Sequence, residues 1–210
     1  LSGLLLKING NEVWVKLIGT FNAYNLLAIY GTAVELGLDS LEVLRLMSEL
    51  ESVSGRFQYI VSNTNITAIV DYAHTPDALE NVLNTINDVR TNNEQLITVV
   101  GCGGNRDTAK RPVMANIATE LSDKVILTSD NPRNEEPEAI IQEMEKGIQA
   151  QNYKKVLSIT DRLQAIKTAC QLAQPNDIIL IAGKGHETYQ EIKGVRHDFD
   201  DMKNVKEILE

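Results

Sequence analysis

The sequence predicts an α/β fold in which a mostly parallel sheet is flanked by helices. Two observations predict this fold. From residue 57 onward, short apolar runs of strand length alternate with segments that repeat apolar residues at helical spacing. Several of these runs, such as 125–127 and 178–181, are apolar without interruption, which is typical of strands buried on both faces of a parallel sheet.

Composition narrows the possible classes of function. The chain has 210 residues, of which 43% are hydrophobic and 23% charged, as in ordinary globular proteins. Its formal charge of -9 argues against general binding of nucleic acid or of anionic membranes. No apolar run approaches the about 18 residues of a membrane span.

The two cysteines, Cys102 and Cys170, form no disulfide framework, and no Cys/His spacing is typical of a zinc site. A reducing compartment fits best, so we expect a cytoplasmic protein. The chain begins at Leu1 in the middle of an apolar alternation. We therefore expect a fragment that starts inside a domain.

The first 54 residues predict a hairpin followed by two helices. Strands are expected over 4–8 and 13–17, and helices over 26–36 and 40–50. Asn9-Gly10 between the strands is a strong hairpin signal, and Asp39 with Glu42 is typical of a helix cap. The helix at 26–36 is apolar on nearly every side, so we expect it to be buried in something larger. These elements are too few for a core of comfortable size, so residues 1–54 are interpreted as the end of a larger domain.

The remaining residues, 55–210, predict the alternating part of the fold. Strands are expected over 57–61, 66–70, 96–100, 125–127, 156–159 and 178–181. Helices are expected to begin at Thr75-Pro76, Arg111-Pro112, Pro137 and Asp161, and a terminal strand and a helix over 202–209 complete the chain.

Four loops that follow predicted strands carry glycine or charged residues. They are 71–75, 101–106, 130–133 and 183–187. If their strands are parallel neighbours, these loops share the carboxyl rim of the sheet, where open α/β sheets bind ligands. The sequence therefore predicts a site on this rim.

The loop Asp130-Asn131-Pro132-Arg133 is the most informative of the four. Arg133 offers a rigid fork of donors suited to a carboxylate, and Asp130 offers an acceptor for an ammonium. Pro132 biases its neighbour toward an extended backbone. One loop thus complements both ends of an amino acid, although the same residue types are also common in surface turns.

The glycine-rich loops fit nucleotide motifs poorly. Gly101-Cys102-Gly103-Gly104-Asn105-Arg106 has Arg106 where a dinucleotide fingerprint needs glycine, which disfavours a nicotinamide-dependent dehydrogenase. Arg106 instead suits a carboxylate or a phosphate, and glycines allow a backbone to approach a ligand closely. The 183–187 loop is too short for a phosphate-binding P-loop. There, Glu187 suits an ammonium, and His186 is a weaker candidate for a general base.

Taken together, five separated stretches resemble the Mur ligase family. They are Phe21-Asn22-Ala23-Tyr24-Asn25-Leu26-Leu27-Ala28, Gly55-Arg56-Phe57, Asp71-Tyr72-Ala73-His74-Thr75-Pro76-Asp77, the loop from Gly101 to Asp107, and Gly183-Lys184-Gly185-His186-Glu187. The similarity is greatest to the branch that adds the third peptide residue to UDP-N-acetylmuramoyl-L-alanyl-D-glutamate during peptidoglycan synthesis.

The resemblance implies a domain assignment and a reaction. Residues 1–54 would end the central α/β ATPase domain, and residues 55–210 would form the Rossmann-like C-terminal domain. Members use ATP and Mg²⁺ to convert a carboxylate into an acyl phosphate, which the amine of the incoming amino acid attacks. The P-loop, the magnesium ligands and the uridine-binding domain lie outside these 210 residues, so we expect the chain alone to be inactive, with no catalytic residue or metal ligand of its own.

The resemblance also implies roles for single residues. Positions near the nucleotide are Asn22, Asn25, Arg56, Asp71 and His74, although helix capping explains several of them equally well. Positions that bind the third amino acid are Arg106, Asp130, Asn131, Pro132, Arg133, Gly183 and Glu187.

Arg133 leads us to predict meso-diaminopimelate as that amino acid. Its far end carries a second carboxylate, which L-lysine lacks, and lysine-adding relatives lack the arginine. An arginine left unpaired around lysine would cost several kcal/mol, enough for ~10⁴-fold discrimination. A related ligase that adds lysine or another amino acid, a free-standing amino-acid-binding module and an interaction domain without a ligand remain alternatives. We expect a monomer that binds neither nucleic acid nor membrane.

Overall fold

The computed structural model describes residues 3–91 and 93–210. The chain divides into two compact units, residues 1–53 and 54–210, close to the boundary at 54 that the sequence predicts. No helix among the described residues has the length and apolar character needed to cross a membrane.

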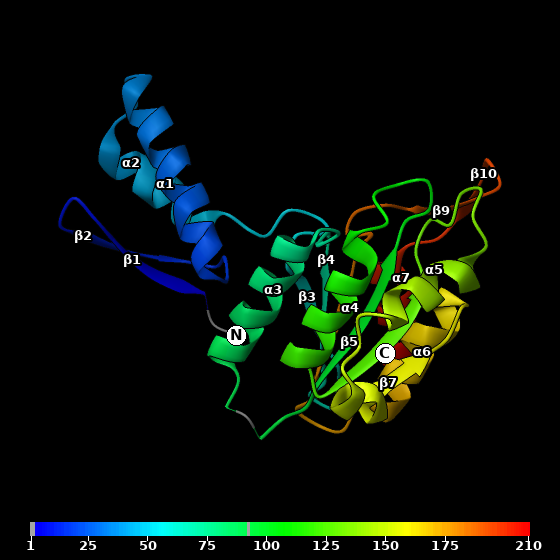
Figure 1. The fold of residues 1–210 in the computed structure, drawn as a ribbon. Helices are drawn as coiled ribbons and strands as arrows, with labels where there is room; N and C mark the ends of the chain where they lie inside the picture. Colours follow the sequence, from blue (N-terminus) through cyan, green and yellow to red (C-terminus); the bar gives the residue numbers. More distant parts are fainter. Residues whose placement is uncertain (1–2, 92) are drawn as a thin grey trace. The chain divides into compact units, whose positions relative to one another are not determined.

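The first unit consists of a β-hairpin and two helices (Figure 1). Strands β1 (Leu4–Ile8) and β2 (Asn11–Val15) pair antiparallel around Asn9-Gly10, both of which have positive φ as the turn requires. Helix α1 spans Thr20–Glu35, and α2 spans Ser40–Glu49. Asp39 caps α2 by accepting from the backbone N–H groups of Leu41 and Glu42, which confirms the predicted cap.

The core of the first unit is small. It contains Val13, Val15, Leu26, Tyr30, Val43, Leu44 and Met47. Helix α1 buries only Leu26 and Tyr30, while Leu27 on the same helix is 57% exposed. The expectation that a larger body covers this helix stays a prediction.

The second unit is built on a six-stranded sheet in the order β3-β4-β8-β5-β6-β7. The strands are β3 (Gln58–Val61), β4 (Thr67–Asp71), β5 (Leu96–Cys102), β6 (Lys124–Ser129), β7 (Val156–Ser158) and β8 (Ile178–Ala182). Only the pairing of β3 with β4 is antiparallel, so the predicted mostly parallel sheet is confirmed.

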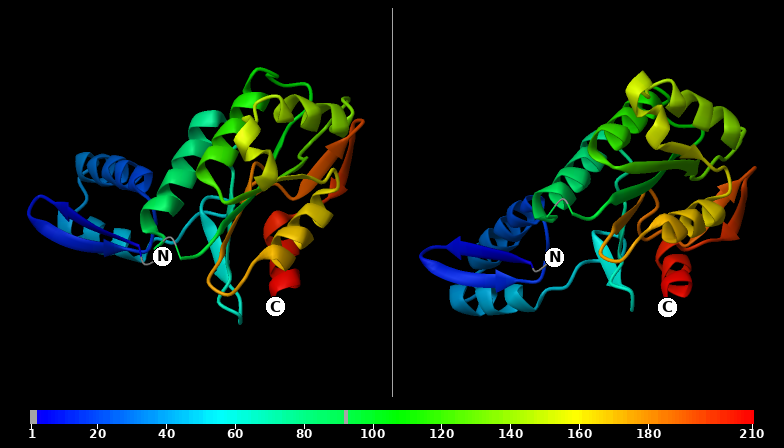
Figure 2. Two further views of the ribbon diagram at one scale, coloured as in Figure 1. Left: turned by 60° about the horizontal axis from the view of Figure 1, so that its bottom comes forward. Right: turned by 90° about the horizontal axis from the view of Figure 1, so that it is seen from below.

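Helices cover both faces of this sheet, as Figure 2 shows. On one face lie α3 (Pro76–Val89), α4 (Lys110–Leu121) and α5 (Pro137–Glu145); on the other lie α6 (Arg162–Leu172) and α7 (Asp201–Leu209). The chain moves outward from β4 through β5 and β6 to β7, then returns to insert β8 at the centre. This reversal places α6 on the second face.

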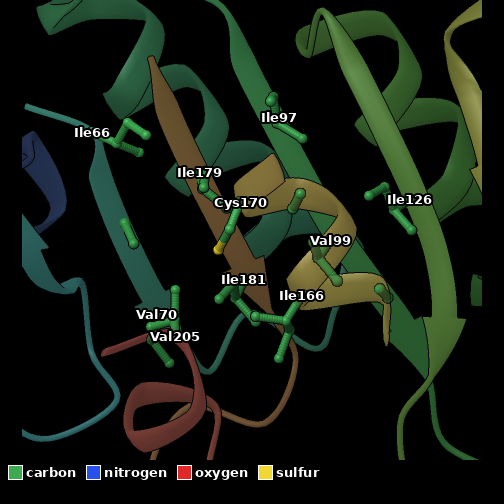
Figure 3. Close-up of a cluster of buried hydrophobic side chains, with 13 residues drawn as sticks. Ile66, Val70, Ile97, Val99, Ile126, Ile166, Cys170, Ile179, Ile181 and Val205 are labelled. Atoms are coloured by element: carbon green, nitrogen blue, oxygen red, sulfur yellow. The ribbon is translucent and has the colours of Figure 1, made fainter. Parts of the chain in front are cut away.

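Alternate residues of the central strands supply the two halves of the core. Ile97, Val99, Ile179 and Ile181 point toward α6 and α7, where they pack with Ile166, Cys170 and Val205 (Figure 3). All five residues of β8 and all seven of β5 are buried, as expected for strands covered on both faces.

The structure differs from the sequence prediction after β8. Instead of a single terminal strand, an antiparallel hairpin forms from β9 (Tyr189–Ile192) and β10 (Val195–Asp198). Its turn is Lys193-Gly194, both with positive φ. A short 3₁₀ helix, Ala150–Lys155, also precedes β7. Neither element has the continuous apolar run on which the prediction relied.

Candidate functional site

A cavity of about 570 Å³ opens at the carboxyl ends of the parallel strands. Because β4, β8, β5 and β6 are neighbours and parallel, the four loops that follow them meet at one rim, as the sequence predicted. The lining includes His74, Arg106, Asp130, Asn131, Arg133, Gly183 and Glu187, all of them predicted site residues, together with Tyr72, Lys110 and Tyr189.

The glycines of these loops let one backbone pack directly on the next. A side chain at Gly104 would collide with the carbonyl of Pro132. The N–H of Gly104 donates to the carbonyl of Asn131 at 2.9 Å. A Cβ at Gly183, whose φ is +117°, would lie 2.8 Å from Asp130 Oδ2. The sequence predicts that the glycines of the 101–106 loop allow close approach of a ligand; these contacts show that Gly104 and Gly183 serve loop-to-loop packing.

Arg133 lies between the 101–106 loop and the β9–β10 hairpin, and its side chain is 20% exposed. One terminal nitrogen, Nη1, donates to the carbonyl of Gly104 at 2.9 Å, and Nε lies 3.4 Å from Glu191 Oε2. The guanidinium therefore lines the cavity with donor capacity remaining, since it carries five N–H groups. Its φ is +51°, a left-handed conformation that is uncommon for arginine.

Asn131 and Glu187 are held by a buried lysine that the sequence analysis did not select. Lys184 is 0% exposed, and its Nζ donates to Asn131 Oδ1 and to Glu187 Oε2, both at 3.1 Å. Asn131 Nδ2 also donates to Glu187 Oε2 at 2.8 Å. Glu187 thus already accepts from an ammonium, that of Lys184. The position of Lys184 between two glycines was the available sequence signal for its role. Its burial could not be predicted, because burial depends on the tertiary fold.

Two fully buried arginines support the rim from beneath. Arg162 donates twice to Asp201, with both contacts at 2.8 Å, and also to the carbonyls of Ser129 and Ala182. These two residues immediately precede Asp130 and Gly183, so one guanidinium ties together the ends of β6 and β8. Coulombic attraction and hydrogen bonding by Asp201 keep the pKa of Arg162 raised against the opposing effect of burial.

Arg111 plays the same part under the glycine-rich loop. Its guanidinium donates to Glu135, to Glu143 at 2.8 Å and to the carbonyl of Gly103 at 3.3 Å. Glu135 in turn accepts from the N–H of Asn105. The hydrogen bond from Arg111 holds the pKa of the Glu135 carboxyl below its usual range.

The predicted nucleotide residues of the second unit gather around Tyr72. The Arg56 guanidinium lies 4.8 Å from the centre of the Tyr72 ring, and the rings of His74 and His186 lie 4.6 and 5.1 Å away. Asp71 is buried nearby and accepts from the N–H of Phe57 at 2.7 Å. Burial raises the pKa of Asp71 above its ordinary value, although backbone hydrogen bonds and Arg56 oppose the shift.

Three further candidates, Asn22, Asn25 and Pro132, lie neither in the cavity lining nor in the group around Tyr72. Asn22 and Asn25 belong to the first unit, where Asn22 donates to the carbonyl of Ile18 at 2.7 Å and Asn25 donates to Asn22. Pro132 shapes its loop and packs on Gly104 without lining the cavity. Burial raises the pKa of the Cys102 thiol to about 12, which argues against a nucleophilic role.

Metal ligands do not gather at this rim. Among residues 3–91 and 93–210, no group of three or more His, Cys, Asp or Glu side chains could hold a metal ion. The lining carries both positive and negative side chains, a combination that suits a small zwitterionic ligand.

A pocket at the strand ends of a doubly wound sheet is typical of α/β domains that bind small molecules. Residues 55–185 match the model of the Mur ligase, glutamate ligase domain family. The chain belongs to the Mur ligase family.

Two curated relatives are UDP-N-acetylmuramoyl-L-alanyl-D-glutamate–2,6-diaminopimelate ligases. The protein of Cytophaga hutchinsonii is 62% identical over the whole chain, and that of Parabacteroides distasonis is 61% identical over 99% of it. In both cases the match covers 43% of the relative's length, so this chain spans less than half of each.

Solved structures agree on the fold. One ligase of the same name is 45% identical, with a TM-score of 0.72 over 95% of this chain and 40% of that one. The UDP-N-acetylmuramate-alanine ligase of Thermotoga maritima is 23% identical with a TM-score of 0.65, covering 94% of this chain and 39% of that one. The second likeness concerns the fold alone.

Proposed function

We propose that this chain is the amino-acid-binding part of a ligase that adds meso-diaminopimelate to UDP-N-acetylmuramoyl-L-alanyl-D-glutamate. The observation that carries the proposal is the Arg133 guanidinium, which lines a polar cavity and keeps donors free for a carboxylate. The names of relatives about 60% identical to this chain support the same reaction. As a step in peptidoglycan synthesis, this reaction would take place in the cytoplasm, in a monomeric enzyme.

The charges around the cavity suit the two ends of diaminopimelate. Arg133 and Arg106 supply donors for its carboxylates, and Asp130 supplies an acceptor for an ammonium. Glu187 already accepts hydrogen bonds from Lys184 and Asn131, which partly neutralise its carboxylate. It would therefore contribute to ammonium binding together with Asn131, as part of one hydrogen-bonded network. Binding in this way would present an amine of the ligand in a fixed direction, which is what attack on an acyl phosphate requires.

Family membership supports a proposal for the roles of the two units. Residues 1–54 would end the central ATPase domain, and residues 55–210 would form the C-terminal domain. ATP would supply the phosphoryl group that activates the glutamate carboxylate, with Mg²⁺ as its companion ion. Asn22, Asn25, Arg56, Asp71 and His74 are the residues of this chain that would lie near the nucleotide.

Calorimetric titration of the 210-residue chain tests the amino-acid specificity. We expect meso-diaminopimelate to bind at least about tenfold more tightly than L-lysine, since a charge-assisted, bidentate contact distinguishes them. Arg133→Ala should remove that difference. Arg45→Ala, on the exposed surface of α2, is the matched control and should preserve it. Equal affinities in the unmodified chain, or a difference that survives Arg133→Ala, would contradict the proposal.

Addition of L-lysine by a related ligase is the second candidate. Asp130 and Glu187 would accept hydrogen bonds from the two ammonium groups of L-lysine as well as from those of diaminopimelate. Arg133 would then face a ligand without a distal carboxylate, which disfavours this candidate. Tighter binding of L-lysine in the same titration would favour it.

A further inference from the structure

The β9–β10 hairpin is joined to the Asp130–Arg133 loop as if it were an added strand. The N–H of Arg133 donates to the carbonyl of Glu191 at 3.0 Å, and the N–H of Lys193 donates to the carbonyl of Arg133 at 2.7 Å. Asn131 Oδ1 accepts from the N–H of Glu191 at 2.9 Å. Arg133 and Ile192 thus form a parallel β-bridge, which fixes the backbone of the loop against the hairpin.

The side chain of Glu191 continues this contact to the guanidinium. Its Oε2 lies 3.4 Å from Arg133 Nε, and the carboxylate is 26% exposed. On the other side, Arg133 Nη1 donates to the carbonyl of Gly104. With one contact on each side, the guanidinium keeps further N–H groups, including both on Nη2, and Arg133 is one of the residues that line the cavity. Glu191 contacts Arg133 but is not itself one of the residues that line the cavity.

We propose that Glu191 is a positioning residue that sets the specificity of the cavity for an amino acid with a distal carboxylate. It acts by holding Arg133 with its terminal nitrogens toward the ligand. This inference rests on the proposed function, because it concerns the same cavity and the same ligand. It adds a residue from a hairpin that supplies no predicted site residue.

Removal of the Glu191 charge has two effects that must be separated. Loss of the contact lets the guanidinium sample other rotamers, which weakens binding of the distal carboxylate only. Loss of the negative charge strengthens binding of any carboxylate, including the α-carboxylate that lysine and diaminopimelate share. The ratio of the two dissociation constants therefore reports on the orientation of Arg133, because the shared effect largely cancels.

Two substitutions separate contact from charge. Glu191→Gln keeps the length of the side chain and removes its charge. Glu191→Asp keeps the charge but is one methylene shorter, so it cannot maintain the 3.4 Å contact. The control is Glu136→Gln, which removes the exposed ion pair between Glu136 and Lys193. It removes a charged contact to the same hairpin but leaves the side-chain contacts of Arg133 in place.

Calorimetric titration with meso-diaminopimelate and with L-lysine gives the ratio for each chain, and thermal melting confirms that each is folded. We expect both Glu191 variants to lower the preference for diaminopimelate about fivefold, as loss of a partly exposed ion pair allows, and Glu136→Gln to leave it unchanged. In NMR, exchange of the Arg133 Nε–H with water should be faster in both Glu191 variants than in the unmodified chain.

Each outcome decides between the two proposals. If the unmodified chain prefers diaminopimelate and both Glu191 variants keep that preference, the positioning role is wrong and the proposed function stands. If Glu191→Asp behaves as the unmodified chain while Glu191→Gln does not, charge alone acts and positioning is again wrong. If the unmodified chain shows no preference, the proposed function fails and the specificity role fails with it.

Discussion

Arg162 and Arg133 are two arginines that act on the same rim in opposite ways. Arg162 lies beneath the rim, is 0% exposed and makes a two-point ion pair with an equally buried Asp201. Arg133 lies in the rim itself, is 20% exposed and makes a single longer contact with Glu191. Arg162 uses its remaining donors on backbone carbonyls, whereas Arg133 keeps several for the cavity.

The difference teaches how a binding arginine is recognised. Both residues are charged, ion-paired and close to a strand end, so proximity to the site does not distinguish them. What distinguishes the two arginines is that Arg133 lines a cavity and retains N–H donors without a partner among the described residues. The layer beneath the rim should therefore control stability, and the rim should control recognition.

Breaking the buried pair should produce the largest effect on stability. Arg162→Met leaves the Asp201 carboxylate buried without its partner, so we expect a loss of about 3–5 kcal/mol in the free energy of unfolding. Urea denaturation followed by circular dichroism measures it. Trp14, the single tryptophan, lies in the first unit, and its fluorescence should show a much smaller change.

The double variant Arg162→Met with Asp201→Asn sharpens this prediction. It removes both charges, so it should recover part of the stability lost in the single variant. A cost below about 1 kcal/mol for Arg162→Met alone would show that the pair is not the support described above.

A smaller effect is expected from Gly104→Ala at the rim. The new methyl group would collide with the carbonyl of Pro132, so the two loops must separate, at a cost of about 1–3 kcal/mol. Gly31→Ala is the control, because it lies within α1 with open space around it and should stabilise its helix by about 0.5–1 kcal/mol. Thermal melting of both variants would show whether the two changes have opposite signs, and equal signs would contradict the loop-packing argument.

The smallest effect concerns the backbone of Arg133. Because its φ is +51°, glycine at this position avoids a strain that alanine retains. Arg133→Gly should therefore be more stable than Arg133→Ala by about 1 kcal/mol, measured by urea denaturation, while both lose the preference for diaminopimelate. If glycine were the less stable of the two, the left-handed conformation would not be a source of strain. If glycine is the more stable, as expected, arginine is present at this position at a cost in stability for the sake of its side chain.

The regular part of the fold was predictable because local signals agreed with the tertiary structure. Thr75 and Asp161 cap α3 and α6, and the apolar runs form the buried strands of the sheet. The β9–β10 hairpin was not predicted, because its strands are polar and partly exposed. The Lys193-Gly194 turn was the one local signal for it.

The candidate site was predictable as a set of loops but not as a network. The rim residues could be selected because each follows an apolar strand and carries charge or glycine. The residues that hold the rim in place could not be selected, because their contacts join distant parts of the sequence. Arg162 and Asp201 are 39 positions apart, and Lys184 and Asn131 are 53 positions apart. Such pairings depend on which strands become neighbours, and residue type alone does not specify that.

The place of β8 in the sheet has a consequence for how the second unit forms during synthesis. Residues 178–182 are made after β4 and β5, yet they lie between them and pair with both. Strand β4 can pair with β3 and β5 with β6 before that segment leaves the ribosome, but the facing edges of β4 and β5 lack their native neighbour until then. These two edges are open to aggregation or to chaperone binding in the meantime, and the rim cannot assemble before β8 has been made.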